Sequence, residues 1–120
     1  MTQLEISEPI RYTSPLKCTA LLVSSRATLC IGQENGSIVQ WSHPNKVVNV
    51  MRTGRHTNWV YYMLEWQGIL WSCSSGDGIR LWNLDSAQLI KEALVGQSVW
   101  TMMNWKGYLV SGGYFNSLNV

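Results

Sequence analysis

Charged side chains are few in this chain, and neither sign is concentrated. They make up 13% of its 120 residues, nine basic against seven acidic, for a net charge of +2. No three basic residues are adjacent. Because binding to nucleic acid or to an anionic membrane depends on a dense basic surface, the sequence indicates neither kind of partner.

Long apolar runs and a secretory leader are also absent. The apolar run from Ala20 to Val23 is far shorter than the roughly 20 residues that a membrane-spanning helix needs. The first residues, MTQLEISEP, contain acids where a leader would carry basic and then apolar residues. We therefore expect a soluble protein of the cytoplasm, with the nucleus as the alternative location.

Cysteine is too sparse to suggest a disulfide framework or a metal site. Cys18, Cys30 and Cys73 are odd in number, lack CxxC spacing and stand within apolar segments. Thiols in such surroundings serve as small core side chains. We expect no metal ion and no cofactor.

Residue patterns for catalysis are missing as well. His43 and His56 stand apart, and the seven acids are spread singly, so there is no nucleophile with a base and no carboxylate pair. Asp77 lies in a Gly-Asp-Gly triplet that a tight turn explains. We expect no catalytic residue, and therefore not an enzyme.

Aromatic residues and glycine are abundant. The chain has seven Trp, five Tyr and ten Gly, a composition that favours short strands separated by tight turns, and hence an all-β fold. We expect most of the tryptophans to pack between sheets, namely Trp41, Trp66, Trp71, Trp82 and Trp105.

The sequence repeats itself with a period of about 40 residues. Gly32–Trp41 aligns without a gap on Cys73–Trp82 at an offset of 41, and Val60–Leu81 aligns on Val99–Val120 at an offset of 39. The middle repeat contains the apolar runs WVYYMLEW, ILWSC, IRLW and QLIKEAL, separated by turns. Four antiparallel strands in about 40 residues form one blade of a β-propeller.

Two segments of the middle repeat, HTNWV at His56–Val60 and SCSSGDGIRLWNL at Ser72–Leu84, resemble the WD-repeat consensus. IGQENGSIVQWS at Ile31–Ser42 resembles it at the same places. The resemblance covers residues 17–120 and implies a β-propeller of four-stranded blades. The short turns in EWQGIL and NWKGYL are most similar to those of F-box/WD-type propellers.

On this interpretation residues 1–120 form a single WD-repeat propeller segment with three blades' worth of sequence. Residues 1–16 are an N-terminal closing strand and linker, 17–54 the first blade, 55–96 the second, and 97–120 a partial third blade.

The family stabilises its blades with a hydrogen-bonded set of Asp, His, Ser or Thr, and Trp. The resemblance assigns the last three positions of this structural tetrad to His56, Ser72 and Trp82. The family's Asp lies in the second turn, and the turn assigned to that place here, Gln67-Gly68, contains no Asp. We therefore expect the tetrad to be incomplete in this blade.

In this family, the residue after the first-strand valine and the residues just past the second strand's Ser-Gly face the top surface and meet partners. The resemblance carries these positions over to Ala20, Tyr61, Trp100, Glu34, Ser75 and Tyr114. Exposed aromatics with a nearby cation, here Arg55, are typical anchors of protein interfaces.

We therefore expect a non-catalytic scaffold that binds a peptide or protein partner on the top face of the propeller. The alternative is a carbohydrate-binding, lectin-like oligomeric propeller with sugars stacked in repeated pockets. A lectin would repeat the same set in every unit, whereas Ala20, Tyr61 and Trp100 differ. This difference favours one extended partner.

Three blades cannot close a ring, because known propellers have about four to eight. We therefore expect residues 3–12 to form the outer strand of a blade begun by residues 97–120 of another copy. The result would be a homo-oligomer, with six blades from a dimer or nine from a trimer. The alternative is that the chain is a fragment of a larger propeller.

Overall fold

The computed structural model describes residues 16–42, 46–51 and 55–113, which form ten β-strands and no helix. Each pair of neighbouring strands is antiparallel. The prediction of an all-β fold is therefore confirmed. The strand expected at residues 3–12 and the predicted partner-binding residue Tyr114 lie outside the described residues. The described part of the chain includes no helix long and apolar enough to span a membrane.

The strands form three sheets in the order of the chain. The first sheet consists of β1 (Cys18–Val23), β2 (Leu29–Gln33), β3 (Ile38–Ser42) and β4 (Lys46–Met51). The second consists of β5 (Val60–Trp66), β6 (Ile69–Ser74), β7 (Gly78–Asn83) and β8 (Leu89–Ala93). The third is the hairpin of β9 (Val99–Trp105) and β10 (Tyr108–Gly113). The three repeats expected from the sequence enclose these three groups of strands.

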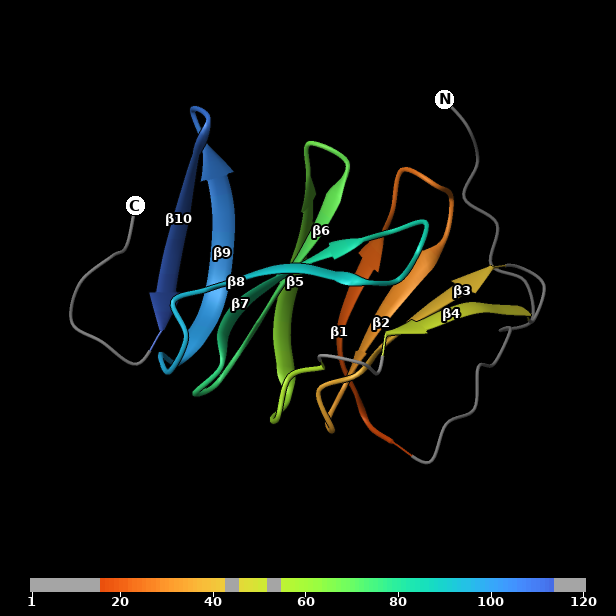
Figure 1. Cartoon of the computed structure of the whole chain (residues 1–120), viewed down its shortest axis with the longest axis horizontal. Coiled ribbons are helices and arrows are strands. Elements are labelled where there is room, and N and C mark those ends of the chain that lie inside the picture. The colour runs from red at the N-terminus through yellow and green to blue at the C-terminus, as the bar shows by residue number, and fades with distance from the viewer. Residues whose placement is uncertain (1–15, 43–45, 52–54, 114–120) are drawn as a thin grey trace, which may run out of the picture.

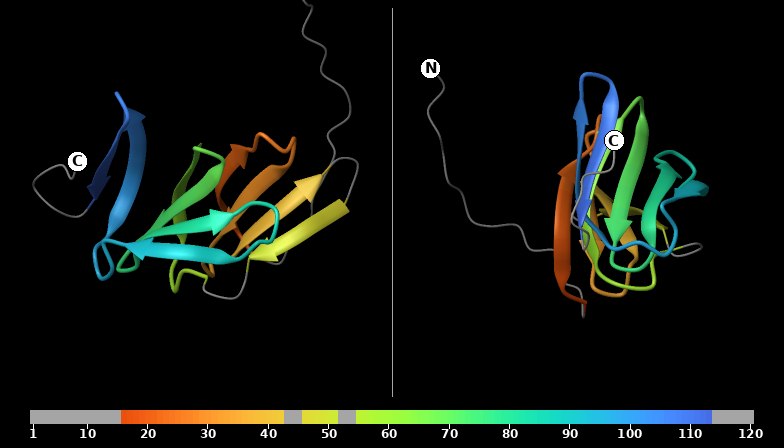
Figure 2. Two further views of the ribbon diagram at one scale, coloured as in Figure 1. Left: turned by 45° about the horizontal axis from the view of Figure 1, so that its top comes forward. Right: turned by 90° about the vertical axis from the view of Figure 1, so that its left-hand side faces the viewer.

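The sheets stand side by side, with the second between the other two (Figure 1). β1, β5 and β9 each form an edge of their sheet, and β5 lies next to both β1 and β9. These three strands run in the same direction, upward in Figure 1, so that they begin at a common end of the molecule. Figure 2 shows the same succession of sheets from two further sides.

The sequence repeat corresponds to a repeat of strand register. Cys73 lies opposite Ile79 between β6 and β7, and Gly32 lies opposite Ile38 between β2 and β3, at the offset of 41 found in the sequence. Met63 opposite Ser72 corresponds in the same way to Met102 opposite Ser111, at the offset of 39. Residues at equivalent positions therefore point to equivalent sides of their sheets.

Each sheet has two faces, which we name from the second sheet. The leading face carries Val60, Met63 and Trp82 or their equivalents, and the trailing face carries Leu64, Trp71 and Ile79 or their equivalents. The register assigns each residue to one of these faces, because successive side chains of a strand point to opposite sides of its sheet.

Two apolar clusters join the sheets. One contains Leu22, Cys30 and Ile38 of the first trailing face together with Met63 and Trp82 of the second leading face. The other contains the second trailing face and the third leading face, including Leu64, Trp71, Ile79, Val99 and Met102. The same kind of interface, trailing face against leading face, is thus formed twice. Apolar burial of this kind contributes about 25 cal/mol per Å² to folding, and both faces of the second sheet provide it.

Candidate functional site

The first strand of every sheet contains a β-bulge close to its beginning. The register shifts between Cys18 and Ala20 in β1, between Val60 and Tyr62 in β5, and opposite Gly112 and Gly113 in β9. A bulge inserts one unpaired residue and changes the direction in which its side chain points. Because β1, β5 and β9 begin at the same end of the molecule, the three bulges lie along one edge of it.

Two of the bulged residues are the aromatic residues predicted to bind a partner. Tyr61 is 37% exposed and Trp100 is 45% exposed. Their ring centroids lie 6.5 Å apart with an interplanar angle of 71°, an edge-to-face contact between neighbouring sheets. This geometry is favourable for aromatic rings, and it leaves part of each ring open to solvent.

The third bulged residue is Thr19, which corrects the alignment made from the sequence. Ala20 lies opposite Gly32, and Tyr62 lies opposite Cys73, so Ala20 corresponds to Tyr62. The residue equivalent to Tyr61 and Trp100 is therefore Thr19. The ungapped alignment of the first strands is therefore wrong by one residue, because a shift of one position within a short strand hardly changes the pattern of residue types.

Glu34 and Ser75, two further predicted partner-binding residues, are engaged within the chain. Glu34 Oε1 accepts a hydrogen bond from the Lys17 backbone nitrogen at 3.3 Å, and the Glu34 nitrogen donates to the Lys17 carbonyl at 3.1 Å. The hydroxyl oxygens of Ser75 and Ser98 lie 2.9 Å apart. Each contact therefore joins the residue after one strand to the residue before another, β2 to β1 and β6 to β9.

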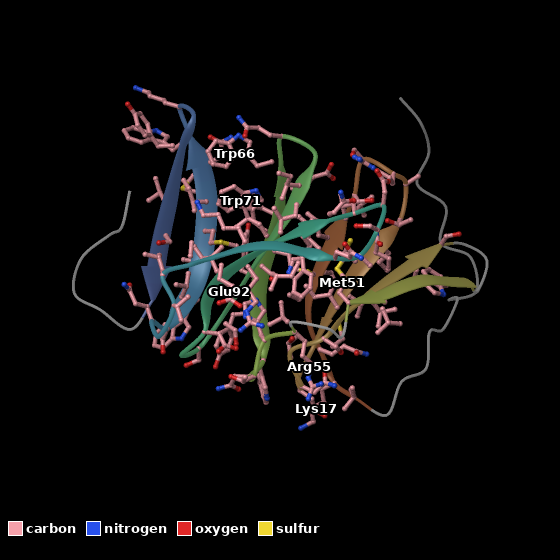
Figure 3. The ribbon with its side chains drawn as sticks, viewed as in Figure 1. Lys17, Met51, Arg55, Trp66, Trp71 and Glu92 are labelled. Atoms are coloured by element: carbon pink, nitrogen blue, oxygen red, sulfur yellow. The ribbon has the colours of Figure 1, made fainter. Side chains whose placement is uncertain are left out.

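Arg55 and Lys17 lie at the end of the molecule where β1, β5 and β9 begin (Figure 3). Arg55 Nε donates to the carbonyl oxygen of Asn35 at 3.1 Å. Within the described part of the chain, neither basic side chain forms an ion pair. Trp59, a residue that the sequence reasoning did not select, is also exposed, in the segment that leads into β5.

His56, Ser72 and Trp82 form a buried hydrogen-bonded chain in the second sheet. His56 Nε2 lies 2.7 Å from Ser72 Oγ, and the Trp82 indole nitrogen donates to the same oxygen at 2.8 Å. All three residues are fully buried. Ser72 Oγ also lies 3.5 Å from the carbonyl oxygen of Arg80, so which partner donates in its contact with His56 depends on the tautomer of the imidazole.

Asp77 stands at the other side of the histidine but does not complete a hydrogen-bonded tetrad, because His56 Nδ1 forms no hydrogen bond within the described residues. Asp77 Oδ2 lies 3.6 Å from His56 Nδ1 and accepts hydrogen bonds from the backbone nitrogen and the hydroxyl of Thr57. The turn Gln67-Gly68 joins β5 to β6, whereas Asp77 lies in the next turn, between β6 and β7. The aspartate was sought one turn too early in the sequence.

The surroundings of His56 favour its neutral form. Burial and, to a smaller extent, the nearby Arg80 guanidinium together lower its pKa to about 4, against the opposing effects of Asp77 and Ser72. Arg80 itself lies 3.9 Å from Asp77 and 3.7 Å from Glu92. The imidazole is therefore uncharged over the physiological pH range.

Asp77, His56 and Ser72 lie next to one another in this order and have the residue types of a hydrolytic triad, but their location prevents such chemistry. Ser72 Oγ is buried between the first and second sheets and already accepts a hydrogen bond from the Trp82 indole, so no substrate carbonyl has access to it. A nucleophile must reach its substrate to act. The arrangement can hold strands together, and we derive no reaction from it.

The remaining sequence expectations have mixed outcomes. Cys30 and Cys73 are buried, and burial raises their pKa values to about 11 and about 12, so both thiols stay protonated. Cys18 is exposed, contrary to its assignment to the core. Trp105 is also exposed, whereas Trp66 packs on Trp71 with ring centroids 5.3 Å apart. The described residues contain no group of three or more His, Cys, Asp or Glu side chains that could hold a metal ion.

The fold defined by these observations is a succession of antiparallel sheets stacked face to face. No protein-family model matches the chain, and its sequence matches no curated protein. Solved structures do match it. The computationally designed Ika4 protein superposes with a TM-score of 0.77 at 17% sequence identity, covering 94% of this chain and 71% of that one.

A second similar structure is the computationally designed Ika8 protein. Its TM-score is 0.67 at 20% sequence identity, and the match covers 80% of this chain and 30% of that one. At these identities the likeness extends to the fold alone.

Proposed function

We propose that the chain is a WD-repeat-type propeller segment in which the first two sheets are blades and the β9–β10 hairpin begins a third. The supporting observations are the four-stranded antiparallel sheets, their repeated register, and the Asp77, His56, Ser72 and Trp82 cluster in the second sheet. The first sheet has Ile31 at the position of Ser72, so it lacks an equivalent cluster.

On this framework we propose a non-catalytic scaffold that binds a peptide or protein partner. The observation that carries the proposal is the pair Tyr61 and Trp100, two large rings held half-exposed by β-bulges at one end of the molecule. Rigid aromatic side chains bury a large area at little cost in rotamer entropy, which makes them effective anchors of an interface. Arg55 and Lys17 add two cations at the same end.

The three bulged positions favour a single extended partner over repeated sugars. Thr19, Tyr61 and Trp100 occupy equivalent places but differ in size and in chemistry. A lectin with one sugar pocket per sheet would need the same contact set at each of them. An extended peptide would instead meet a different side chain on each sheet.

A displayed library of random peptides, selected on the intact chain, provides the test. The affinity of a selected peptide is measured for the wild type and for Trp100→Ala and Tyr61→Ala by calorimetry. We expect Trp100→Ala to weaken binding by about 2 kcal/mol or more, because it removes an anchor ring. The matched control is Trp105→Ala, which removes an exposed tryptophan from the other end of β9.

The proposal requires the two tryptophans to differ in this assay. If neither Trp100→Ala nor Tyr61→Ala weakens any selected peptide, or if Trp105→Ala weakens them equally, the aromatic pair is not the binding site. A glycan array is the parallel measurement. Binding of one sugar at several equivalent sites would favour the lectin alternative instead.

A further inference from the structure

Each of the two outermost sheet faces of the described chain presents exposed apolar side chains, on the first sheet along β1, whereas Ile31 and Val39 of that same face are buried. On the leading face of the first sheet, Leu21 is 62% exposed, whereas its equivalents Met63 and Met102 are 3% and 2% exposed. On the trailing face of the third sheet, Met103 is 54% exposed, whereas its equivalent Leu64 is partly buried against the neighbouring cluster. Each exposed residue therefore has a counterpart within the chain that is covered.

These counterparts show which residues cover each kind of face. Met63 of the second leading face shares a cluster with Leu22 and Cys30 of the first trailing face. Met102 of the third leading face packs in the same way with Leu64 and Trp71 of the second trailing face. By register, the next members of these two series are Leu21 on one outer face, and Met103 and Val110 on the other.

We propose that the leading face of the first sheet binds the trailing face of the third sheet in a second copy of this chain. Leu21 of one copy would then lie against Met103 and Val110 of the next, with Val23 nearby. The partner is identified by the recurring interface, because each outer face is equivalent to one half of a contact that the chain already forms twice. One chain cannot join its own two faces, since the second sheet stands between them (Figure 1).

The proposed contact is heterologous, with different surfaces on the two copies. This property separates it from a two-fold symmetric dimer, in which the same surface would occur on both sides. It is also independent of the peptide-binding role, because Tyr61 and Trp100 lie at the strand beginnings, whereas Met103 lies further along β9. A failure of one proposal therefore leaves the other unchanged.

The test is the association state of the full chain and of two single variants, measured by analytical ultracentrifugation. We expect the wild type to associate beyond its 13.6 kDa monomer mass. Leu21→Glu and Met103→Glu should each weaken self-association at least about 100-fold, because each buries an unpaired carboxylate in an apolar contact. Val95→Glu is the control, since Val95 is as exposed as Leu21 but lies in the loop between β8 and β9.

Mixing the two variants gives the decisive result. Leu21→Glu retains an intact third sheet and Met103→Glu an intact first sheet, so the mixture should form a one-to-one complex although each alone is a monomer. Circular dichroism should show both variants folded. A wild type that stays monomeric over the accessible concentration range, or a mixture that shows no complex, would overturn the proposal. A mixture without complex beside an associating wild type would indicate a symmetric contact elsewhere.

Discussion

At the scale of single residues, the cluster around His56 shows what the sequence could and could not predict. His56, Ser72 and Trp82 were selected from the sequence because they stand at fixed places relative to the strand pattern, and the structure brings all three together. Asp77 was missed because the turn that holds it was misnumbered. Thr19 was missed because a bulge displaces one residue and leaves its neighbours in the expected pattern.

Replacing His56 by Ala should destabilise the second sheet. The change removes the ring that forms a buried hydrogen bond with Ser72 Oγ and opens a cavity beside Trp82. We expect the free energy of unfolding in urea to fall by about 1–3 kcal/mol. Ser86→Ala, at an exposed turn position, serves as the control. A loss no larger than that of the control would mean that the cluster does not contribute to stability.

The same histidine should make stability depend on pH. Its pKa in the folded state is about 4, below the unfolded value of about 6.5, so the unfolded chain binds the proton more readily. The contribution of His56 is therefore complete above pH 6.5 and is lost progressively as the pH falls from about 6.5 to about 4. The loss amounts to about 3 kcal/mol.

Urea denaturation of the wild type and of His56→Ala across this range measures the effect. The stability of the wild type should fall toward the variant's as the pH is lowered. Parallel curves for the two proteins would contradict the assignment of a neutral, buried imidazole.

At the scale of elements, alternation within the repeats predicted the strands well. The runs ILWSC and IRLW of the sequence correspond to β6 and β7, and QLIKEAL contains β8. The positions of the strands can be predicted from the local pattern, because alternate residues of a strand point to opposite faces of its sheet. The exposure of Trp105 does not follow from that pattern. It depends on the neighbours of the residue in three dimensions, and the equivalent Trp66 is half-buried and packs on Trp71.

The turn between β6 and β7 offers a matched pair of glycines. Gly76 and Gly78 both have positive φ angles, 80° and 72°. A Cβ on Gly78 would lie 2.2 Å from the Leu94 carbonyl oxygen, whereas one on Gly76 would meet nothing within 4 Å. The backbone at Leu94 therefore approaches Gly78 closely but does not approach Gly76.

We expect Gly76→Ala to cost about 1 kcal/mol, the strain of a left-handed residue, and Gly78→Ala to cost clearly more than about 2 kcal/mol. Thermal or urea unfolding of the two variants measures the difference. Equal losses would show that the contact with Leu94 does not restrict this turn.

At the scale of the whole molecule, the order of the sheets follows directly from the sequence repeat, but the covering of the outer faces does not. The repeat specifies how the second sheet meets each neighbour, since its two faces carry complementary side chains. It contains no information on the partner of Leu21 or Met103. Only the exposure of these side chains in the structure identifies them.

Self-association through the outer faces should couple stability to protein concentration. A contact made only in the folded state raises the midpoint of thermal unfolding as the protein is concentrated. We expect Tm to rise with concentration for the wild type and for Val95→Glu, and to stay constant for Leu21→Glu. Differential scanning fluorimetry over a dilution series gives the comparison. A wild-type Tm that is independent of concentration would contradict the coupling.

The equal register of successive sheets has a consequence for how such a chain can grow. The two faces of the second sheet, residues 55–96, form the two complementary halves of one kind of interface. A gene that copied this segment in tandem would therefore encode a further sheet that packs against its neighbours in the same way. No new interface would have to be invented at each duplication. Length could then change in whole modules, while the sequence of each module drifts independently wherever it does not touch its neighbour.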